Sequence, residues 1–197
     1  MKTITITGIN NRYQIKKILN PVSIPITKKK YDMIIKEHPT IVDMTSQWIT
    51  LNDILAKYKN SPDISNVPLT PMETIILNEI KIKINSYKSQ DLCNKFTTNL
   101  VISIIQCIEL LINSNNICYY CNEPCYIFYE HIRYPKQWTL DRIDNSIGHH
   151  LDNVVIACLK CNLQRKNKNS NKFLQSKQLK LVKLEDYTTT TPICEDH

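Results

Sequence analysis

The sequence predicts an α+β protein in which a mainly helical N-terminal part precedes a small hairpin-and-helix module held together by cysteines. Three observations favour this class. Two segments of helix length, 71–87 and 97–112, carry apolar residues at helical spacing. The stretch 138–166 contains two strand-like runs around a turn at Gly148. One CxxC pair precedes this stretch, and a second lies inside it.

The composition is that of a globular protein without extended disorder. Hydrophobic residues make up 42% and charged residues 22% of the 197 residues, which suits one compact domain with a small appendage. The longest apolar stretch, 100–112, is interrupted by polar residues and is too short to span a bilayer. The N-terminus lacks the apolar core of a signal peptide. We therefore expect no membrane partner and an intracellular, soluble protein of the cytoplasm or nucleus.

Residues 1–68 are expected to form an N-terminal appendage. Thr and Ile alternate over residues 1–7, which predicts a short strand, and residues 28–36 are expected to form a helix. Residues 48–51 are predicted to be extended and to lead into a short helix capped at Asn52. The boundary with the next segment is marked by a cluster of prolines, at positions 62, 68 and 71.

Residues 69–113 are predicted to form the helical core. Thr70 stands before a proline, and Glu73 follows three residues later, which is typical of a capped helix start. The second helix, 97–112, is apolar on nearly every face, as expected for a helix at the centre of a fold. Because it leads directly into the first CxxC pair, we expect it to pack against the module at 114–184.

Four cysteines have the spacing of a structural zinc site. Cys118 and Cys121 are followed by 36 residues and then by Cys158 and Cys161. A CxxC knuckle turns both sulfurs toward one point, and two knuckles complete a tetrahedral shell with no open position. Zinc binding worth on the order of 10 kcal/mol would allow so small a module to keep its shape. Cys125 could compete as a ligand, although its spacing is not that of a knuckle.

Asp141 and Asn162 are candidate ligands of a second cation. Asp141 ends the first strand-like run, and Asn162 directly follows the last cysteine at the start of a helix. Because zinc would fix that helix against the hairpin, the carboxylate and the amide oxygen can approach one point. Oxygen ligands of this kind select a hard cation such as Mg²⁺ or Mn²⁺.

The stretch 114–170 resembles the HNH, or ββα-metal, endonucleases of the zinc-stapled, treble-clef kind. These enzymes combine CxxC pairs with an Asp-His strand end, a mid-hairpin Asn, and an Asn or His on the following helix. The resemblance implies that Asp141 and Asn162 bind the catalytic cation and that Asn153 ties the loop together. It also implies metal-dependent hydrolysis of DNA phosphodiester bonds, with 5′-phosphate and 3′-hydroxyl products.

Arg142 stands where the family usually has the histidine that serves as general base. Arginine is always protonated and cannot take a proton from water, but it can bind a phosphate and stabilise its charge. Some divergent members of the family also have Asp-Arg at this point. Another group must then activate the water, and the candidates are His149, His150 and Asp144. Asp144 equally suits an Asx turn in its own loop.

The net charge is +7, and seven basic residues follow Asn162 before the first acidic residue, Glu185, which predicts a nucleic-acid partner, DNA or RNA. Residues 185–197 are expected to form a flexible tail. Two other functions stay open: a non-catalytic zinc module that binds nucleic acid through a degenerate site, and a protein-interaction domain on a zinc scaffold. The residues expected to contact the phosphate backbone are Arg165, Lys166, Lys168 and Lys172.

Overall fold

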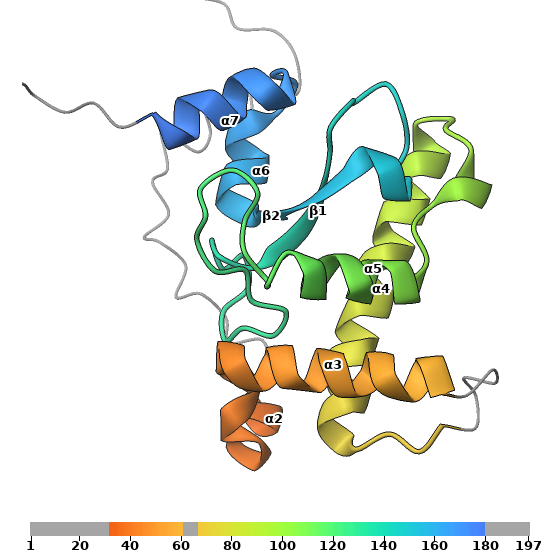
Figure 1. Cartoon of the computed structure of the whole chain (residues 1–197), viewed down its shortest axis with the longest axis vertical. Helices are drawn as coiled ribbons and strands as arrows, with labels where there is room; N and C mark the ends of the chain where they lie inside the picture. Colours follow the sequence, from red (N-terminus) through yellow and green to blue (C-terminus); the bar gives the residue numbers. More distant parts are fainter. Residues whose placement is uncertain (1–31, 61–66, 180–197) are drawn as a thin grey trace, which may run out of the picture.

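The computed structural model describes residues 32–60 and 67–179, which form a mainly helical fold around one small antiparallel sheet (Figure 1). This confirms the mixed, mainly helical class predicted from the sequence. The long helix α4 (Pro71–Cys93) runs through the molecule, and α3 (Met44–Asn60) and α5 (Ile104–Asn113) cross it. None of the helices in the two described ranges combines the length and the apolar character that a membrane span needs.

The described chain before α4 is helical. Helix α2 (Asp32–Glu37) covers the described part of the helix predicted over 28–36, and the short 3₁₀ helix η1 (Pro39–Val42) follows it. The extended segment predicted at 48–51 is wrong, because these residues lie inside α3. The buried side chains of α3 recur every three or four residues: Gln47, Thr50, Leu51, Ile54 and Tyr58.

The start of α3 also differs from the prediction. Asp43 precedes the helix, and its Oδ2 accepts a hydrogen bond from the backbone N–H of Ser46 at 2.8 Å. This is the contact of a helix cap, so the cap lies at Asp43 and not at Asn52 as predicted. Asn52 lies inside α3 instead, where its Nδ2 donates to the carbonyl of Trp48 at 2.8 Å.

Helix α4 begins with the predicted capping box. The hydroxyl of Thr70 accepts from the N–H of Glu73, and the carboxylate of Glu73 accepts from the N–H of Thr70 at 2.6 Å. Lys57 of α3 pairs with the same carboxylate at 2.6 Å, so the cap also joins two helices. The helix continues to Cys93, well past the predicted end at Tyr87.

Helix α5 is shorter than the helix predicted over 97–112. Ser103 and Gln106 form a second capping box, which the sequence analysis missed, and the helix therefore begins at Ile104. The residues before it form the 3₁₀ helix η3 (Thr98–Leu100) and an extended link. A capping box needs only two correctly spaced polar side chains, so the signal for this start was present in the sequence.

The sheet is a hairpin of two strands. Strands β1 (Trp138–Arg142) and β2 (Val154–Cys158) pair in a regular antiparallel ladder, and the 3₁₀ helix η4 (Leu151–Asn153) precedes β2. Helix α6 (Leu159–Arg165) follows β2 without a break, and α7 (Ser170–Gln178) follows α6 after a short turn. The order of strand, strand and helix is therefore continuous in the chain.

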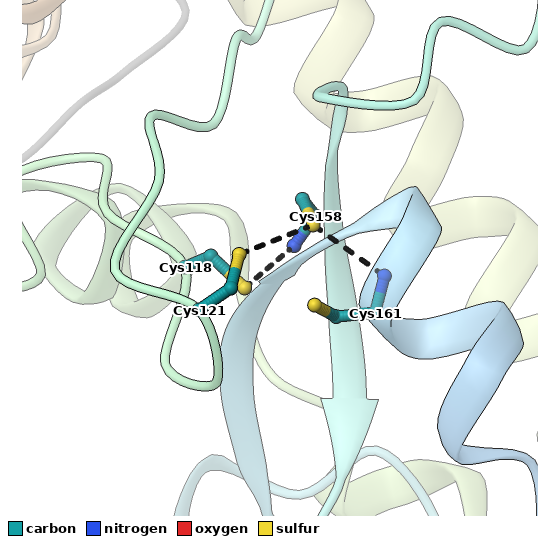
Figure 2. Close-up of side chains that lie close together, drawn as sticks. All are labelled: Cys118, Cys121, Cys158 and Cys161. Atoms are coloured by element: carbon teal, nitrogen blue, oxygen red, sulfur yellow. Dashed lines mark hydrogen bonds between the residues drawn. The ribbon is translucent and has the colours of Figure 1, made fainter. Parts of the chain in front are cut away.

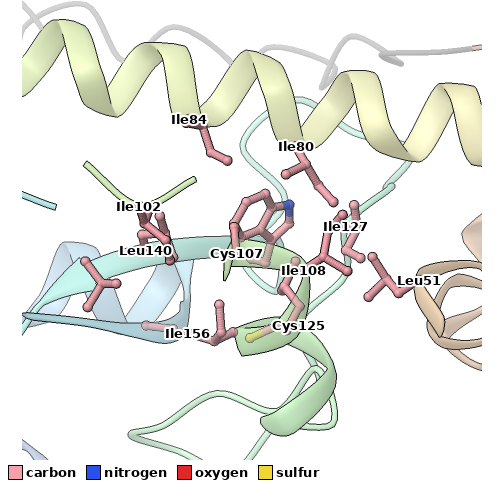
Figure 3. Close-up of a cluster of buried hydrophobic side chains, with 14 of the residues drawn as sticks. Leu51, Ile80, Ile84, Ile102, Cys107, Ile108, Cys125, Ile127, Leu140 and Ile156 are labelled. Atoms are coloured by element: carbon pink, nitrogen blue, oxygen red, sulfur yellow. The ribbon is translucent and has the colours of Figure 1, made fainter. Parts of the chain in front are cut away.

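Among the described residues, a hydrophobic core joins the helices to the hairpin (Figure 3). Leu51 of α3, Ile80 of α4 and Ile108 of α5 are almost completely buried in it. Leu140 of β1 and Ile156 of β2 belong to the same cluster. The described part of the predicted N-terminal appendage therefore shares its core with the rest of the chain.

One face of α4 also holds the hairpin through polar contacts. The ammonium of Lys83 donates to the carbonyl of Trp138, and the hydroxyl of Tyr87 accepts from the N–H of Leu140 at 3.0 Å. Asp91 binds the connection between the strands. Because Lys83, Tyr87 and Asp91 are spaced by four residues, they lie along one side of the helix. We call these three residues the α4 stripe.

Predictions for both ends of the chain fall outside the described residues. These are the strand predicted over 1–7 and the tail predicted over 185–197. The proline cluster at the predicted boundary is described only in part, because residues 61–66 are not among those described. Pro71 is the first residue of α4, where the missing N–H of proline costs nothing.

Candidate functional site

The four predicted zinc ligands lie together (Figure 2). Cys118 and Cys121 come from the loop after α5, Cys158 ends β2, and Cys161 lies in the first turn of α6. Their sulfurs are all within 4.8 Å of one another, and the sulfurs of Cys121 and Cys158 are 3.8 Å apart. A tetrahedral zinc with bonds of about 2.3 Å separates its sulfurs by about 3.8 Å. The cluster could therefore hold a zinc ion.

Backbone N–H groups point at the cluster. The N–H of Cys158 donates to the sulfur of Cys118 at 3.3 Å, and the N–H of Cys161 donates to the sulfur of Cys158 at 3.4 Å. Cys158 also caps α6 through this second contact. Hydrogen bonds of this kind favour the thiolate form that a metal ion requires.

Cys125 is fully buried near Cys118, but it does not belong to the cluster of four sulfurs. Hydrogen bonds with the thiols of Cys125 and Cys158 lower the pKa of Cys118. The pKa of Cys125 is raised by its hydrogen bond with Cys118 and by burial.

Asp141 is enclosed between the hairpin and α6. Its carboxylate forms an ion pair with Arg165, in which Nε lies 2.6 Å from Oδ2 and Nη2 lies 2.9 Å from Oδ1. The hydroxyl of Tyr120 donates to Oδ2 at 2.7 Å. Asp141 is 5% exposed and Arg165 is 1% exposed, so water screens this pair very little.

Arg165 joins the end of α6 to the hairpin. Its Nη2 also donates to the carbonyl of Arg142 at 2.5 Å and to Oδ1 of Asn145 at 2.8 Å. Its Nη1 donates to the carbonyl of Lys168 at 2.8 Å. Burial opposes the charge, but the contacts with Asp141 outweigh it and raise the pKa of Arg165. The structure thus places Arg165 in the interior instead of on the predicted nucleic-acid surface, because a buried carboxylate needs such a partner.

Asn162 packs against the same side of the hairpin as Asp141. Its Nδ2 donates to the hydroxyl of Thr139 at 3.1 Å and to the carbonyl of Leu140 at 3.4 Å. Thr139 and Asp141 are two residues apart in β1, so their side chains project from the same face. The structure therefore brings Asp141 and Asn162 to one side of the hairpin, next to the cysteine cluster.

Arg142 projects from the opposite face. The ladder stays regular through Arg142, which pairs with Val154, so the side chains of Asp141 and Arg142 diverge. The Nη1 of Arg142 donates to the carbonyl of Ile147 at 3.3 Å, and its guanidinium lies 5.4 Å from the ring centre of Phe96. The described hairpin has no bulge at this point, so the two side chains do not turn toward one point.

Asn153 ties the connection between the strands together. Its Oδ1 accepts from the N–H of Asp144 at 2.9 Å, and its Nδ2 donates to the carbonyls of Asp144 at 2.9 Å and Gly148 at 3.0 Å. Asn153 is buried, so these bonds are protected from competing water. They fix the shape of the connection, which is the role that the resemblance implies for Asn153.

Asp144 is engaged in a turn of its own. Its Oδ1 accepts from the N–H of Ser146 at 2.8 Å and from the hydroxyl of Ser146 at 2.7 Å. These bonds lower the pKa of Asp144. A carboxylate with a lowered pKa is a weaker base, so the contacts favour the Asx turn over a catalytic role.

His149 is buried against α4. Its ring Nδ1 lies 2.7 Å from Oδ1 of Asp91, and its backbone N–H donates to Oδ2 of Asp91 at 2.7 Å. The centre of its ring is 4.6 Å from that of Tyr87. Burial lowers the pKa of His149, and Asp91 partly opposes this effect. Sequence reasoning missed Asp91, because 58 residues separate it from His149 and no local pattern links them.

His150 lies on the same side of the molecule as His149. It forms an isolated bridge with Val101, in the link before α5, and the N–H of Ile102 donates to the carbonyl of His149 at 2.8 Å. Both histidines thus contact α4 or the link that leads into α5. Asp141, by contrast, faces α6.

The exposed lysines surround the turn between α6 and α7. Lys166, Lys168 and Lys172 are all exposed. Lys166 directly follows α6 and has a positive φ of 52°, and the ammonium of Lys168 lies 6.0 Å from the ring centre of Phe173. These charges give the turn a positive surface.

No protein-family model, curated protein or solved structure matches this chain. Function therefore rests on features of the chain itself. These are the cysteine cluster, the shared side of Asp141 and Asn162, the connection tied by Asn153, and the positive turn after α6.

Proposed function

We propose that this chain is a metal-dependent HNH-type endonuclease that hydrolyses DNA phosphodiester bonds on a zinc-stapled, treble-clef-like ββα-metal module. The observation that supports it best is the position of Asp141 and Asn162. One comes from β1 and the other from α6, and they lie on one side of the hairpin next to a cysteine cluster that could hold zinc.

A divalent cation suits this pair of donors. The carboxylate of Asp141 and the amide oxygen of Asn162 are the hard oxygen ligands that Mg²⁺ and Mn²⁺ prefer. Because the Nδ2 of Asn162 donates to Thr139, the orientation of the amide and of its Oδ1 is fixed. A bound cation of this kind polarises a phosphate and lowers the pKa of its bound water.

The other residues of the proposed site fix its structural elements and position the DNA. The cysteine cluster fixes α6 against β2, and Asn153 fixes the connection between the strands. The lysines after α6 would position the DNA backbone without reading its sequence. Asp144 and His149 are engaged with other partners, as the preceding contacts show, and we assign neither the role of general base.

Substitution of Asn162 gives the cleanest test, because its side chain makes fewer contacts than that of Asp141. With plasmid DNA and Mg²⁺ or Mn²⁺, we expect Asn162→Ala to cut about 100-fold more slowly or worse. Asn167→Ala, an exposed asparagine just after α6, is the matched control and should cut normally. Asp141→Asn should also be inactive, whereas the exposed Asp152→Asn should not. Cutting that survives both Asn162→Ala and Asp141→Asn would exclude the proposal.

The second candidate is a non-catalytic zinc module that binds nucleic acid. The buried pair of Asp141 and Arg165 favours it, because a carboxylate neutralised in this way resembles a structural ion pair. This function predicts DNA binding that weakens steeply with salt and produces no cleavage with either cation. Metal-dependent nicking that is lost in Asn162→Ala would exclude it.

A further inference from the structure

We propose that Arg165 and the divalent cation compete for the carboxylate of Asp141, so that Arg165 holds the site closed until a cation and a DNA phosphate displace it. The inference rests on the proposed function, because it takes Asp141 as a cation ligand. It gives the buried arginine a regulatory role at that same site.

The competition follows from the contacts of Asp141. Both carboxylate oxygens bind Arg165, at 2.6 Å and 2.9 Å, and Tyr120 adds a third hydrogen bond to Oδ2. A cation on this carboxylate would place two more positive charges beside the guanidinium. In a site that is only 5% exposed at Asp141, the repulsion is poorly screened. The cation and the guanidinium therefore exclude each other.

The place of Arg165 in the chain gives a route by which its guanidinium would withdraw from Asp141. It is the last residue of the short helix α6, and its remaining partners belong to loops or to the end of a strand. These are the carbonyls of Arg142 and Lys168 and the side chain of Asn145. A change in the turn after α6 could withdraw the guanidinium while the cysteines keep the first turn of α6 in place.

A phosphodiester offers Arg165 an equivalent partner. Two phosphate oxygens match the fork of a guanidinium in the same way as the two oxygens of a carboxylate. Arg165 would thus exchange the anion of Asp141 for that of the DNA backbone. The exchange explains how one arginine can be buried in this structure and still contact nucleic acid when a cation and DNA are bound.

Manganese binding tests the competition without any cleavage assay. With the full-length zinc-loaded chain, we expect Arg165→Gln to bind Mn²⁺ about tenfold more tightly or better than the natural chain, measured by electron paramagnetic resonance titration. Lys160→Gln removes an exposed charge from α6 but leaves Asp141 untouched, and it should stay within about twofold. The gain should disappear in the double variant Asp141→Asn, Arg165→Gln. Equal or weaker binding by Arg165→Gln would overturn the proposal, as would a gain that persists without the Asp141 carboxylate.

A second measurement covers the case in which Arg165→Gln folds poorly. In the natural chain, the Nε–H resonance of Arg165 should shift when Mg²⁺ and a short DNA duplex are added together, and an unchanged resonance would overturn the proposal. Cleavage assays separate the two proposals. If the natural chain cuts DNA but Arg165→Gln gains no Mn²⁺ affinity, the competition is wrong and the nuclease function stands. If Asn162→Ala does not affect cutting, the nuclease site itself is wrong.

Discussion

Gly148 allows the connection between the strands to approach α4 closely. A Cβ at this position would lie 2.7 Å from Oδ2 of Asp91. Asp91 is fully buried and held by two contacts with His149, so it has little freedom to retreat. The connection and α4 approach this closely because Gly148 has no side chain.

We expect Gly148→Ala to lower the free energy of unfolding by about 1–3 kcal/mol, because the added methyl group forces Asp91 away from His149. Urea denaturation measures the change. In an Asp91→Ala background, most of this cost should disappear, since the clashing carboxylate is gone. Equal costs in the two backgrounds would show that the strain arises elsewhere.

The site residues that could be predicted are those with a local signal. A CxxC pair carries its geometry within four residues, so the metal cluster could be found from spacing alone. Asp91 and Tyr120 could not, because their partners lie 58 and 21 residues away. Arg165 was recognised as basic, but the identity of a residue does not reveal that a buried carboxylate will draw it inward.

Between elements, one buried amide joins α3 to the loop before β1. The Nε2 of Gln47 donates to the carbonyls of Ile41 at 2.7 Å and Phe128 at 2.8 Å. Its Oε1 accepts from the N–H of Ile127 at 2.8 Å and from that of Phe128 at 3.2 Å. Gln47 is fully buried, and its amide satisfies backbone groups that no water can reach.

Gln47→Ala should therefore lower the free energy of unfolding by about 2–4 kcal/mol, because it leaves buried N–H and carbonyl groups unpaired. Thermal and urea denaturation give the value. Gln90→Ala, at an exposed position of α4, is the matched control and should change it by less than about 0.5 kcal/mol. A loss of similar size in both variants would contradict a specific role for the Gln47 amide.

A helix start whose signal lies within a few residues was predicted correctly, whereas a helical segment that depends on contacts between distant residues was missed. The start of α4 was predictable because Thr70 and Glu73 cap it within one turn. Residues 48–51 were predicted as extended because Trp48, Ile49 and Thr50 favour strands by themselves. The core overrides this preference, since Leu51 and Ile54 are buried together only in a helix.

For the whole molecule, the cysteine cluster brings together segments that are distant in the chain. It joins sulfurs from the loop after α5 with sulfurs from the end of β2 and the start of α6. We expect about one tightly bound zinc per chain, and we expect its removal by a strong chelator to lower the melting temperature. Zinc sites of this kind contribute on the order of 10 kcal/mol.

The zinc prediction can be tested with two cysteine variants. Elemental analysis should find zinc lost from Cys158→Ser, while Cys93→Ser should retain it, because Cys93 is exposed in α4 and outside the cluster. In thermal denaturation, Cys158→Ser should melt at a lower temperature than the natural chain, whereas Cys93→Ser should melt at about the same temperature. Full zinc content and unchanged melting in Cys158→Ser would show that the cluster is not the binding site.

Sequence patterns could not predict that α3 shares its hydrophobic core with the rest of the chain. The prolines at 62, 68 and 71 interrupt the helical pattern and so mark a boundary along the chain. A boundary along the chain does not determine whether the two sides pack together, because packing depends on contacts between distant residues. Helix α3 lies before the prolines and still contributes Leu51 and Ile54 to the core.

The α4 stripe affects which fragment of this protein would keep its structure when it is moved into another protein. A fragment that begins at residue 114 would contain the cysteine cluster, the hairpin and α6, yet it would lose Lys83, Tyr87 and Asp91 together. A fragment that begins at Thr70, with the cap of α4, keeps these three contacts but still loses Leu51 and Ile54 of α3 from the shared core. In recombination, natural or engineered, α4 and the hairpin are therefore expected to be inherited as one unit.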